Sequence, residues 1–228
     1  MKRTEFIKKV FTDTLPVLAG YFVLGIGFGM LLKAHGYGWL FSAYMCVGIY
    51  AGSMQFVMIE MLSEGVGLVS AALTAFLVNC RHLFYSITMV DRYRDTGRAK
   101  PYLIFALTDE TFSLVSTEDS VPPEQRRQYY LAVSVINQLY WVGSCVLGSL
   151  LGSALKFNTE GIDFALTALF VCIFTEQWLS GKEHISAQLG LGLSLLCLLI
   201  FGAESFLIPS MIAIVAAMAI VRGKERAA

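Results

Sequence analysis

The chain has 228 residues, of which 56% are hydrophobic and only 15% are charged, and its formal net charge is +0. An ordinary soluble domain has about 25% charged residues, so this composition indicates a membrane protein. Because the charge is balanced and no basic patch is interleaved with aromatic residues, the sequence lacks the electrostatic features of a nucleic-acid binder.

The chain begins with a charged leader, residues 1–13, which contains Met1-Lys2-Arg3 and Lys8-Lys9. The apolar run that overlaps its end, Phe11 to Leu32, is longer than the apolar region of a signal peptide. No convincing small-x-small cleavage site follows it. We therefore predict a retained first span instead of a removed signal.

Apolar segments follow one another along the rest of the chain, and their charge-free stretches approach or exceed the roughly 17–25 residues that cross a hydrocarbon core. They lie near 14–33, 38–62, 65–90, 101–117, 128–155, 162–180, 184–202 and 204–221. The prediction is an all-α fold, a polytopic transmembrane helix bundle of about 6–8 membrane segments. It forms a single transmembrane domain at 14–221, followed by a cytoplasmic tail at 222–228.

Lys and Arg collect in the leader, in the loop at 91–100 and in the tail, which the positive-inside rule places on the cytoplasmic side. Three apolar segments separate the leader from this loop, and an odd number of crossings would put the two on opposite faces. We expect 38–62 not to cross, because Gly48 and then Ala51-Gly52-Ser53 interrupt it. The alternative is that the loop is an exception to the charge rule.

Five segments separate the loop at 91–100 from the tail, so one of these should also fail to cross. Segment 162–180, which Asp163 opens, is the candidate. Interrupted helices in corresponding places are typical of transporters built from inverted repeats, where they form the substrate site near the midplane. The sequence thus favours one or two interrupted or re-entrant helices and is compatible with an inverted repeat.

Small residues recur at helical spacing in two segments. Gly25-xxx-Gly29 and Gly148-xxx-Gly152 allow helices to approach closely in lipid. The five cysteines all sit inside apolar runs and lack CxxC spacing, so we interpret them as small apolar residues and not as disulfides or metal ligands.

Strong polar residues interrupt the apolar segments 65–90 and 101–117. The first carries Asn79, Arg81 and His82, with Tyr85 and Ser86 further along, and the second carries Thr108-Asp109-Glu110. A short basic loop joins the two segments, which should pair as antiparallel helices. Counted from that loop at 1.5 Å per residue, Arg81 and Asp109 both lie roughly 12–14 Å deep.

An isolated charge at the bilayer centre costs at least about 2.5–3.5 kcal/mol, so such residues usually pair or face a watery cavity. We therefore predict that Arg81 and His82 meet Asp109 and Glu110 in a buried polar cluster. The alternative is that Arg81 snorkels to the interface while Asp109 and Glu110 begin a loop.

Segment 38–62 adds the run Gly52-Ser53-Met54-Gln55-Phe56. If a half-helix begins after Gly52, its free N–H groups and dipole form a site for a carboxylate. Close helix packing at Gly52 and Ser53, and interhelical hydrogen bonding by Gln55 without function, are the alternatives.

Four motifs in this order and spacing resemble the AzlC-type branched-chain amino-acid permeases, over nearly the whole chain. They are Ala51-Gly52-Ser53-Met54-Gln55-Phe56, Asn79-Cys80-Arg81-His82-Leu83-Phe84-Tyr85-Ser86, Thr108-Asp109-Glu110-Thr111-Phe112 and Asp163-Phe164-Ala165-Leu166. Two positions depart from the family pattern: Cys80, where an aliphatic residue is usual, and Thr167, where proline is common.

The resemblance implies a secondary transporter in the bacterial inner membrane, the large subunit of a two-component exporter of branched-chain amino acids. It further implies leucine, isoleucine, valine and also methionine or analogues as substrates, and a separate small multispanning AzlD-type subunit as partner. Uptake of another small metabolite and a non-transporting membrane scaffold are the alternative functions.

An amino-acid zwitterion must exchange water at both charged ends for protein groups, so its carrier needs an anion site, a cation site and an apolar slot. We assign the carboxylate to Gly52 and Ser53 with Arg81, the ammonium to Asp109 or Glu110, and the side chain to Met54, Phe56 and Phe112. The full substrate-binding set adds Gln55, Asn79 and Tyr85, and the proton-coupling candidates are His82, Asp109, Glu110 and Asp163.

The chain lacks the motifs that would indicate an enzyme. No G-x-x-x-x-G-K-[ST] loop, HExxH or GxSxG occurs, so neither ATP hydrolysis nor an intramembrane hydrolase is supported. We expect no cofactor and no metal, and transport driven by a proton gradient or by the substrate's own gradient.

Overall fold

A computed structural model of the chain describes residues 2–116, 120–154 and 184–202, with a few short stretches between 171 and 221. Two compact units, Met1–Ala165 and Leu166–Ala228, divide the chain. The described residues contain helices and turns and no strand, in agreement with the predicted all-α class.

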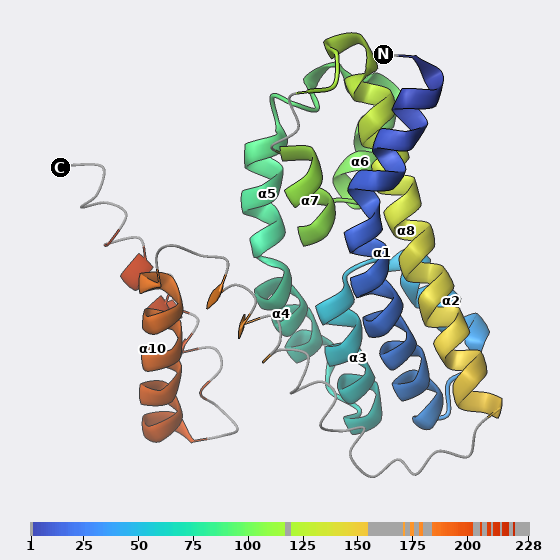
Figure 1. The fold of residues 1–228 in the computed structure, drawn as a ribbon. Helices are drawn as coiled ribbons and strands as arrows, with labels where there is room; N and C mark the ends of the chain where they lie inside the picture. Colours follow the sequence, from blue (N-terminus) through green and yellow to red (C-terminus); the bar gives the residue numbers. More distant parts are fainter. Residues whose placement is uncertain are drawn as a thin grey trace. The chain divides into compact units, whose positions relative to one another are not determined.

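Two long helices form the frame of the first unit. Helix α1 (Arg3–Ala34) and helix α8 (Pro123–Ala154) have 32 residues each, a length of roughly 48 Å. Within the described chain they are the two helices that are individually long and apolar enough to cross a membrane. They run side by side in the same direction, with both N-terminal ends at the same end of the unit (Figure 1).

The small-residue ridges of these two helices face one another. A Cβ atom added at Gly25 would lie 2.6 Å from the Cβ of Ser144, and one at Gly152 would lie 3.3 Å from the Cα of Met30. Added Cβ atoms at Gly29 and Gly148 would collide with backbone of the other helix. The predicted close approach is therefore present, and the two glycine motifs meet each other.

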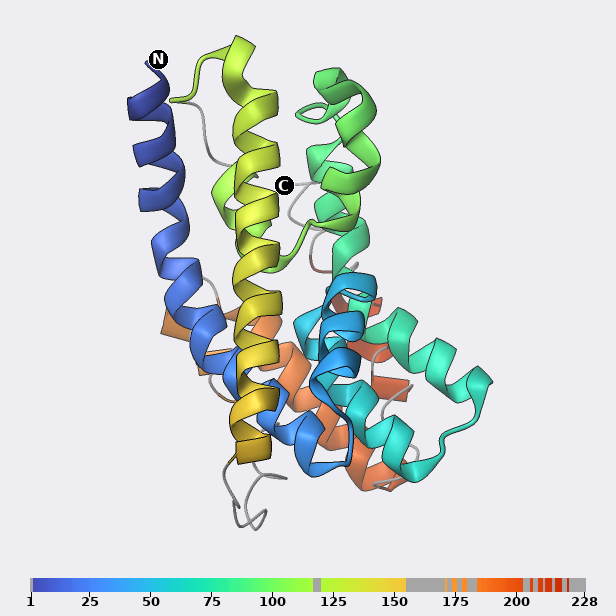
Figure 2. The ribbon, with the colours of Figure 1, turned by 90° about the vertical axis from the view of Figure 1, so that its right-hand side faces the viewer.

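Segment 38–62 is broken where the sequence predicts. Helix α2 (Trp39–Gly48) ends before Ile49, and helix α3 (Gly52–Glu64) begins three residues later. Tyr50, between them, has a left-handed φ of 39°. Because α2 starts at the end of the unit where α1 finishes, and α3 returns to that end, the break lies near the middle of the unit (Figure 2).

Segment 65–90 is not one straight helix. Helix α4 (Leu68–Asn79) and helix α5 (Arg81–Met89) meet at Cys80 with a bend of 48°. Taken together they would make a third candidate span. No Gly or Pro stands at the bend, so it had no sequence signal.

Segment 101–117 was expected to be a single helix, and this prediction is wrong at residues 106–108. After the 3-10 helix η1 (Arg94–Ala99), helix α6 (Lys100–Phe105) ends in a break, and helix α7 (Asp109–Ser116) begins beyond it. The side chain of Thr108 stabilises the new start, because its Oγ1 accepts a hydrogen bond from the Thr111 N–H at 3.3 Å. The alternative that Asp109 and Glu110 begin a loop is also wrong.

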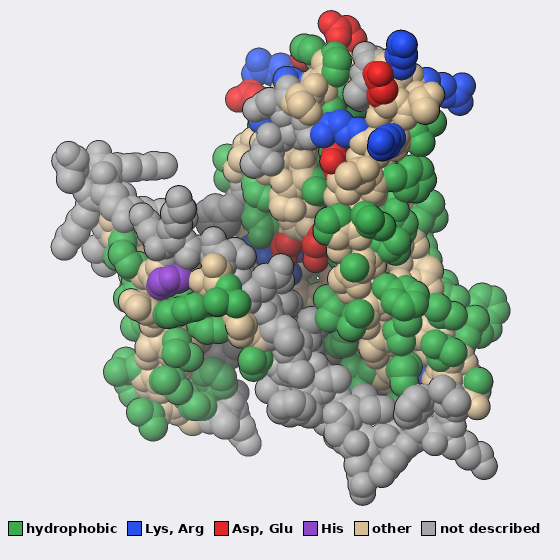
Figure 3. Space-filling view, in the orientation of Figure 1, with side chains coloured by type: hydrophobic (Ala, Val, Ile, Leu, Met, Phe, Trp, Pro, Cys, Tyr) green, Lys and Arg blue, Asp and Glu red, His purple; other side chains and the backbone are tan. Residues whose placement is uncertain are grey.

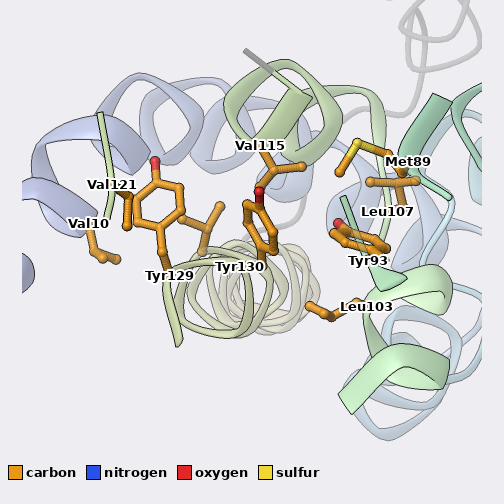
Figure 4. Close-up of a cluster of buried hydrophobic side chains, with 10 residues drawn as sticks. Val10, Met89, Tyr93, Leu103, Leu107, Val115, Val121, Tyr129 and Tyr130 are labelled. Carbon is orange, nitrogen blue, oxygen red and sulfur yellow. The ribbon is translucent and has the colours of Figure 1, made fainter. Parts of the chain in front are cut away.

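A buried apolar cluster holds α6 and α7 against the long helices at the end that carries the N-terminus. Figure 4 shows the side chains that form it, which come from α1, α5, α6, α7, α8 and the segments that connect them. Its members are Val10, Met89, Tyr93, Leu103, Leu107, Val115, Val121, Tyr129, Tyr130 and Val133.

Basic side chains of the first unit gather at that same end (Figure 3). The leader and the loop at 91–100 therefore lie at one end of the unit, as we expected from the basic residues that they share. The tail at 222–228 lies outside the described residues.

In the second unit the structure describes one longer helix, α10 (Ile185–Phe201), which contains no charged residue. Asp163, and most of the segment 162–180 in which a second interruption was expected, lie outside the described residues.

Candidate functional site

Arg81, the first residue of α5, contacts two other helices. Its Nη1 lies 2.6 Å from Oδ2 of Asp109, and its Nη2 donates a 2.7 Å hydrogen bond to Oγ of Ser53. The Arg81 and Asp109 side chains are 32% and 34% exposed in the structure. The predicted meeting of opposite charges from two neighbouring segments is thus present.

Three helix starts converge on this ion pair. Ser53 lies in the first turn of α3, Asp109 begins α7, and Arg81 begins α5. A helix N-terminus carries a partial positive charge and unpaired N–H groups. No side chain caps α3, so its first N–H groups add to the positive charge of Arg81, and Asp109 is the acid that forms an ion pair with Arg81.

Glu110 does not join Arg81, although the sequence argument placed both acids near it. Its Oε2 accepts a 2.7 Å hydrogen bond from the hydroxyl of Tyr21 in α1. That hydroxyl also lies 2.9 Å from Oγ1 of Thr108. The two consecutive acids therefore serve different partners, Asp109 toward α5 and Glu110 toward α1.

Helix α8 fixes the first turn of both half-helices, α3 and α7, with a pair of buried side chains one turn apart. Trp141 Nε1 donates a 2.7 Å hydrogen bond to Oε1 of Gln55 in α3. Asn137 Nδ2 donates a 3.1 Å hydrogen bond to Oγ1 of Thr111 in α7. The two breaks also approach each other, since the rings of Tyr50 and Phe105 are 6.4 Å apart.

A half-buried aromatic pair lies beside the Arg81–Asp109 ion pair. Tyr85 of α5 stacks on Phe112 of α7, with ring centroids 4.5 Å apart and an interplanar angle of 14°. His82 packs its ring edge against Tyr85, and its Nδ1 lies 3.1 Å from the carbonyl oxygen of Asn79. Among the described residues these are the contacts of His82, and neither partner is an acid.

Met54 and Phe56 are each 2% exposed and belong to the packed interior. Phe56 contacts Phe28 edge-to-face at 5.4 Å. Tyr85 and Phe112 are only partly buried, whereas Met54 and Phe56 pack within the interior beside the start of α3.

Several buried polar atoms around the site make no hydrogen bond with any described residue. Two are donors, the Nε2 of Gln55 in α3 and the Nε of Arg81 in α5, and the hydroxyl of Tyr50 is a third unpaired group. Acceptors without a partner are the Oδ1 atoms of Asp109, Asn79 and Asn137. Buried polar groups are normally paired, so these free donors and acceptors suit a ligand that carries both an anionic and a cationic end.

Within the described residues no group of three or more His, Cys, Asp or Glu side chains is arranged to hold a metal ion. The described cysteines Cys46, Cys80, Cys145 and Cys197 are free thiols.

Sequence reasoning missed the residues that hold the site from the long helices. Tyr21 and Trp141 gave no signal, because aromatic residues are common in apolar helices. Asn137 could have been noticed, since it is an amide in the charge-free run of α8.

The family model and the similar proteins found for this chain point to the same family. The family model described as AzlC protein matches residues 16–155. A protein of Bacillus subtilis named branched-chain amino acid transport protein AzlC is 41% identical over 215 residues, which cover 94% of this chain and 85% of that protein.

An uncharacterized membrane protein of Haemophilus influenzae is 41% identical over 92% of this chain and 87% of its own length. The inner membrane protein YgaZ of Escherichia coli is 30% identical over 166 residues, covering 71% of this chain and 67% of that protein. No solved structure matches the chain.

Proposed function

The chain belongs to the AzlC family, and from this premise we propose that it is a secondary transporter that exports branched-chain amino acids. The substrates proposed are leucine, isoleucine, valine and the similarly apolar methionine. The names of the relatives support a membrane transport protein, and they fit a function other than catalysis.

One observation carries this proposal: Arg81 joins the starts of α3 and α7 at mid-depth, with unpaired donors on Gln55 and Arg81 and an unpaired acceptor on Asp109. A zwitterion has the complementary distribution of charge. When its carboxylate meets Arg81 and the free N–H groups of α3, its ammonium can take the place of Arg81 beside Asp109. Each buried charge then keeps a partner throughout the exchange, as a low-dielectric site requires.

The apolar end of the substrate is assigned to the stacked pair Tyr85 and Phe112. These rings are half-buried and lie on the same two helices as Arg81 and Asp109. A branched aliphatic side chain gains about 0.8 kcal/mol for each methylene that it removes from water. The slot therefore favours large apolar amino acids over glycine and alanine.

For the topology we propose a bundle of about 6–8 membrane segments in the bacterial inner membrane, with the N-terminus in the cytoplasm. The pair α2–α3 would enter from the far side and α6–α7 from the cytoplasmic side, each turning back at mid-depth. The leader at 1–13, a single membrane domain at 14–221 and a cytoplasmic tail at 222–228 stay predictions.

An inverted repeat is part of this proposal, supported by two similar half-helix starts. Gly52-Ser53-Met54-Gln55-Phe56 and Thr108-Asp109-Glu110-Thr111-Phe112 both follow a break and both end in Phe. In each, the fourth residue accepts a hydrogen bond from α8. Opposed half-helices of this kind form midplane substrate sites in other carriers.

We further propose an AzlD-type small membrane subunit as partner, as the family resemblance implies. Large apolar side chains cover the outer surface of the first unit, for example Leu68 at 89% and Val23 at 70% exposure, as is needed against lipid or a second membrane protein.

The test is leucine efflux from proteoliposomes that contain the full chain, with and without the small subunit. Arg81→Gln and Asp109→Asn should each lower efflux at least about tenfold, since each leaves the other charge of the pair without its partner. Arg94→Gln and Asp91→Asn are the matched controls, because that ion pair is 74% and 86% exposed. Normal efflux in both Arg81→Gln and Asp109→Asn would show that this ion pair is not the site.

A further inference from the structure

Glu110 stands in an environment of its own, separate from the Arg81–Asp109 ion pair. Consecutive helical residues point about 100° apart, and Glu110 accordingly turns toward Tyr21 of α1. Among the described residues no Lys, Arg or His forms an ion pair with it. A carboxylate at mid-depth of a membrane without a cationic partner is costly, and such residues mark ion or proton pathways.

Two hydroxyl groups lie at this carboxylate. The Tyr21 hydroxyl donates to Glu110 and lies 2.9 Å from Oγ1 of Thr108. Tyr21 is 4% exposed and Thr108 is 8% exposed, so both belong to the interior. Oxygen ligands on a single carboxylate suit a small hard cation and offer nothing to an anion.

Tyr50 supplies an independent sign of a ligand at this place. Its side chain is 3% exposed, and its hydroxyl faces Tyr21, Thr108 and Glu110. The hydroxyl nevertheless forms no well-aligned hydrogen bond with any described residue. Tyr50 holds this position at the cost of a left-handed φ of 39°, which is unfavourable for a residue other than Gly, Asn or Asp.

We propose that Glu110, Tyr21, Tyr50 and Thr108 form the binding site of the coupling ion, a small monovalent cation, either a proton carried by the Glu110 carboxyl or a sodium ion. The site rests on the proposed transport function and refines it, since it separates the coupling ion from His82 and Asp109. It lies where the break between α2 and α3 meets the break between α6 and α7. Occupancy of one site can therefore bias both half-helix pairs.

The titratable and charged groups that face Glu110 come from each neighbouring element. They are Tyr21 of α1, Tyr50 of the first break and Tyr85 of α5, and the preceding residue, Asp109, is paired with Arg81. The tyrosines are neutral near pH 7, and Arg81 is engaged by Asp109. The charge of Glu110 is therefore left for the cation to neutralise.

The experiment compares two modes of leucine transport in proteoliposomes of the full chain. Exchange of internal for external leucine needs no net movement of the coupling ion, whereas accumulation against a leucine gradient does. Glu110→Gln should lose gradient-driven accumulation, and this loss should be much larger than its effect on exchange. Glu64→Gln, which changes an exposed acid at the end of α3, is the matched control and should keep both modes.

Two driving forces are applied separately to identify the cation: a pH gradient without sodium, and a sodium gradient at constant pH. Tyr50→Phe removes only the unpaired hydroxyl and should raise the half-saturating concentration of the effective cation about tenfold, the usual effect of one hydrogen bond to a charged centre. If Glu110→Gln accumulates leucine normally, or if neither gradient drives wild type, the cation site is wrong. If wild type does not exchange leucine at all, the proposed function itself fails.

Discussion

Replacing Gly29 by Ala should separate the two long helices. The added Cβ would lie 2.5 Å from the backbone nitrogen of Ser149 and closer still to the carbonyl oxygen of Cys145. Ordinary contact begins at 3.4 Å, so α1 and α8 would have to move apart by more than about 0.9 Å at this point. A gap of roughly 0.5–1 Å forfeits a quarter to a half of the dispersion energy of the facing atoms.

The expected cost of Gly29→Ala is that of overpacking a core, about 1–3 kcal/mol. Gly148→Ala should cost a similar amount, because its Cβ would meet the backbone of Ile26. The matched controls are Gly27→Ala in α1 and Gly143→Ala in α8, where no atom lies within 4 Å of the new Cβ. These should stabilise their helices by roughly 0.5–1 kcal/mol, since alanine is the better helix former.

The measurement is the melting temperature of the detergent-solubilised protein. It is obtained from the fraction of protein that remains monodisperse after heating to each temperature. The two pairs of variants should differ by about 1.5–4 kcal/mol, which corresponds to roughly 3–16 °C for a chain of this size. If the melting temperature of Gly29→Ala equals or exceeds that of Gly27→Ala, the close backbone contact between the helices does not exist.

Two further substitutions test the site. Trp141→Phe deletes the donor to Gln55 and leaves a buried amide unpaired, which should cost about 1–3 kcal/mol. Trp39→Phe, at a 47% exposed position, should leave the melting temperature unchanged, and equal melting of the two variants would contradict the importance of this hydrogen bond. Phe112→Ala removes the ring stacked on Tyr85 and should reduce the preference for leucine over alanine about tenfold, the value of roughly two methylene contacts. Competition of the two amino acids for labelled leucine efflux measures this preference, and an unchanged ratio would place the apolar slot elsewhere.

Regular features of the site were predictable because helices have a fixed rise and because some residues interrupt them. Counting residues from the basic loop placed Arg81 and Asp109 at one depth, and the 2.6 Å ion pair confirms this level. The break before Gly52 was predictable since Gly48 and Gly52 disfavour a continuous helix. The close approach of the glycine ridges followed from their spacing, but which ridge meets which did not.

The features that could not be predicted depend on contacts between distant parts of the chain. Ala106 and Leu107 are good helix formers, yet the helix breaks there, where Thr108 caps α7 and contacts Tyr21. Glu110 lies 89 residues from Tyr21 in sequence, so no local pattern links them. The bend at Cys80 likewise has no local helix breaker.

Backbone-to-backbone contact between α1 and α8 leaves these helices little freedom to tilt or slide. The pairs α2–α3 and α6–α7, in contrast, each reach the centre from one end only (Figure 1). In the proposed transporter, movement of one pair would open its own end of the unit while the other end stays closed. Arg81 contacts the inner end of each pair through Ser53 and Asp109. A movement of one pair would therefore change the contacts that Arg81 makes with the other pair.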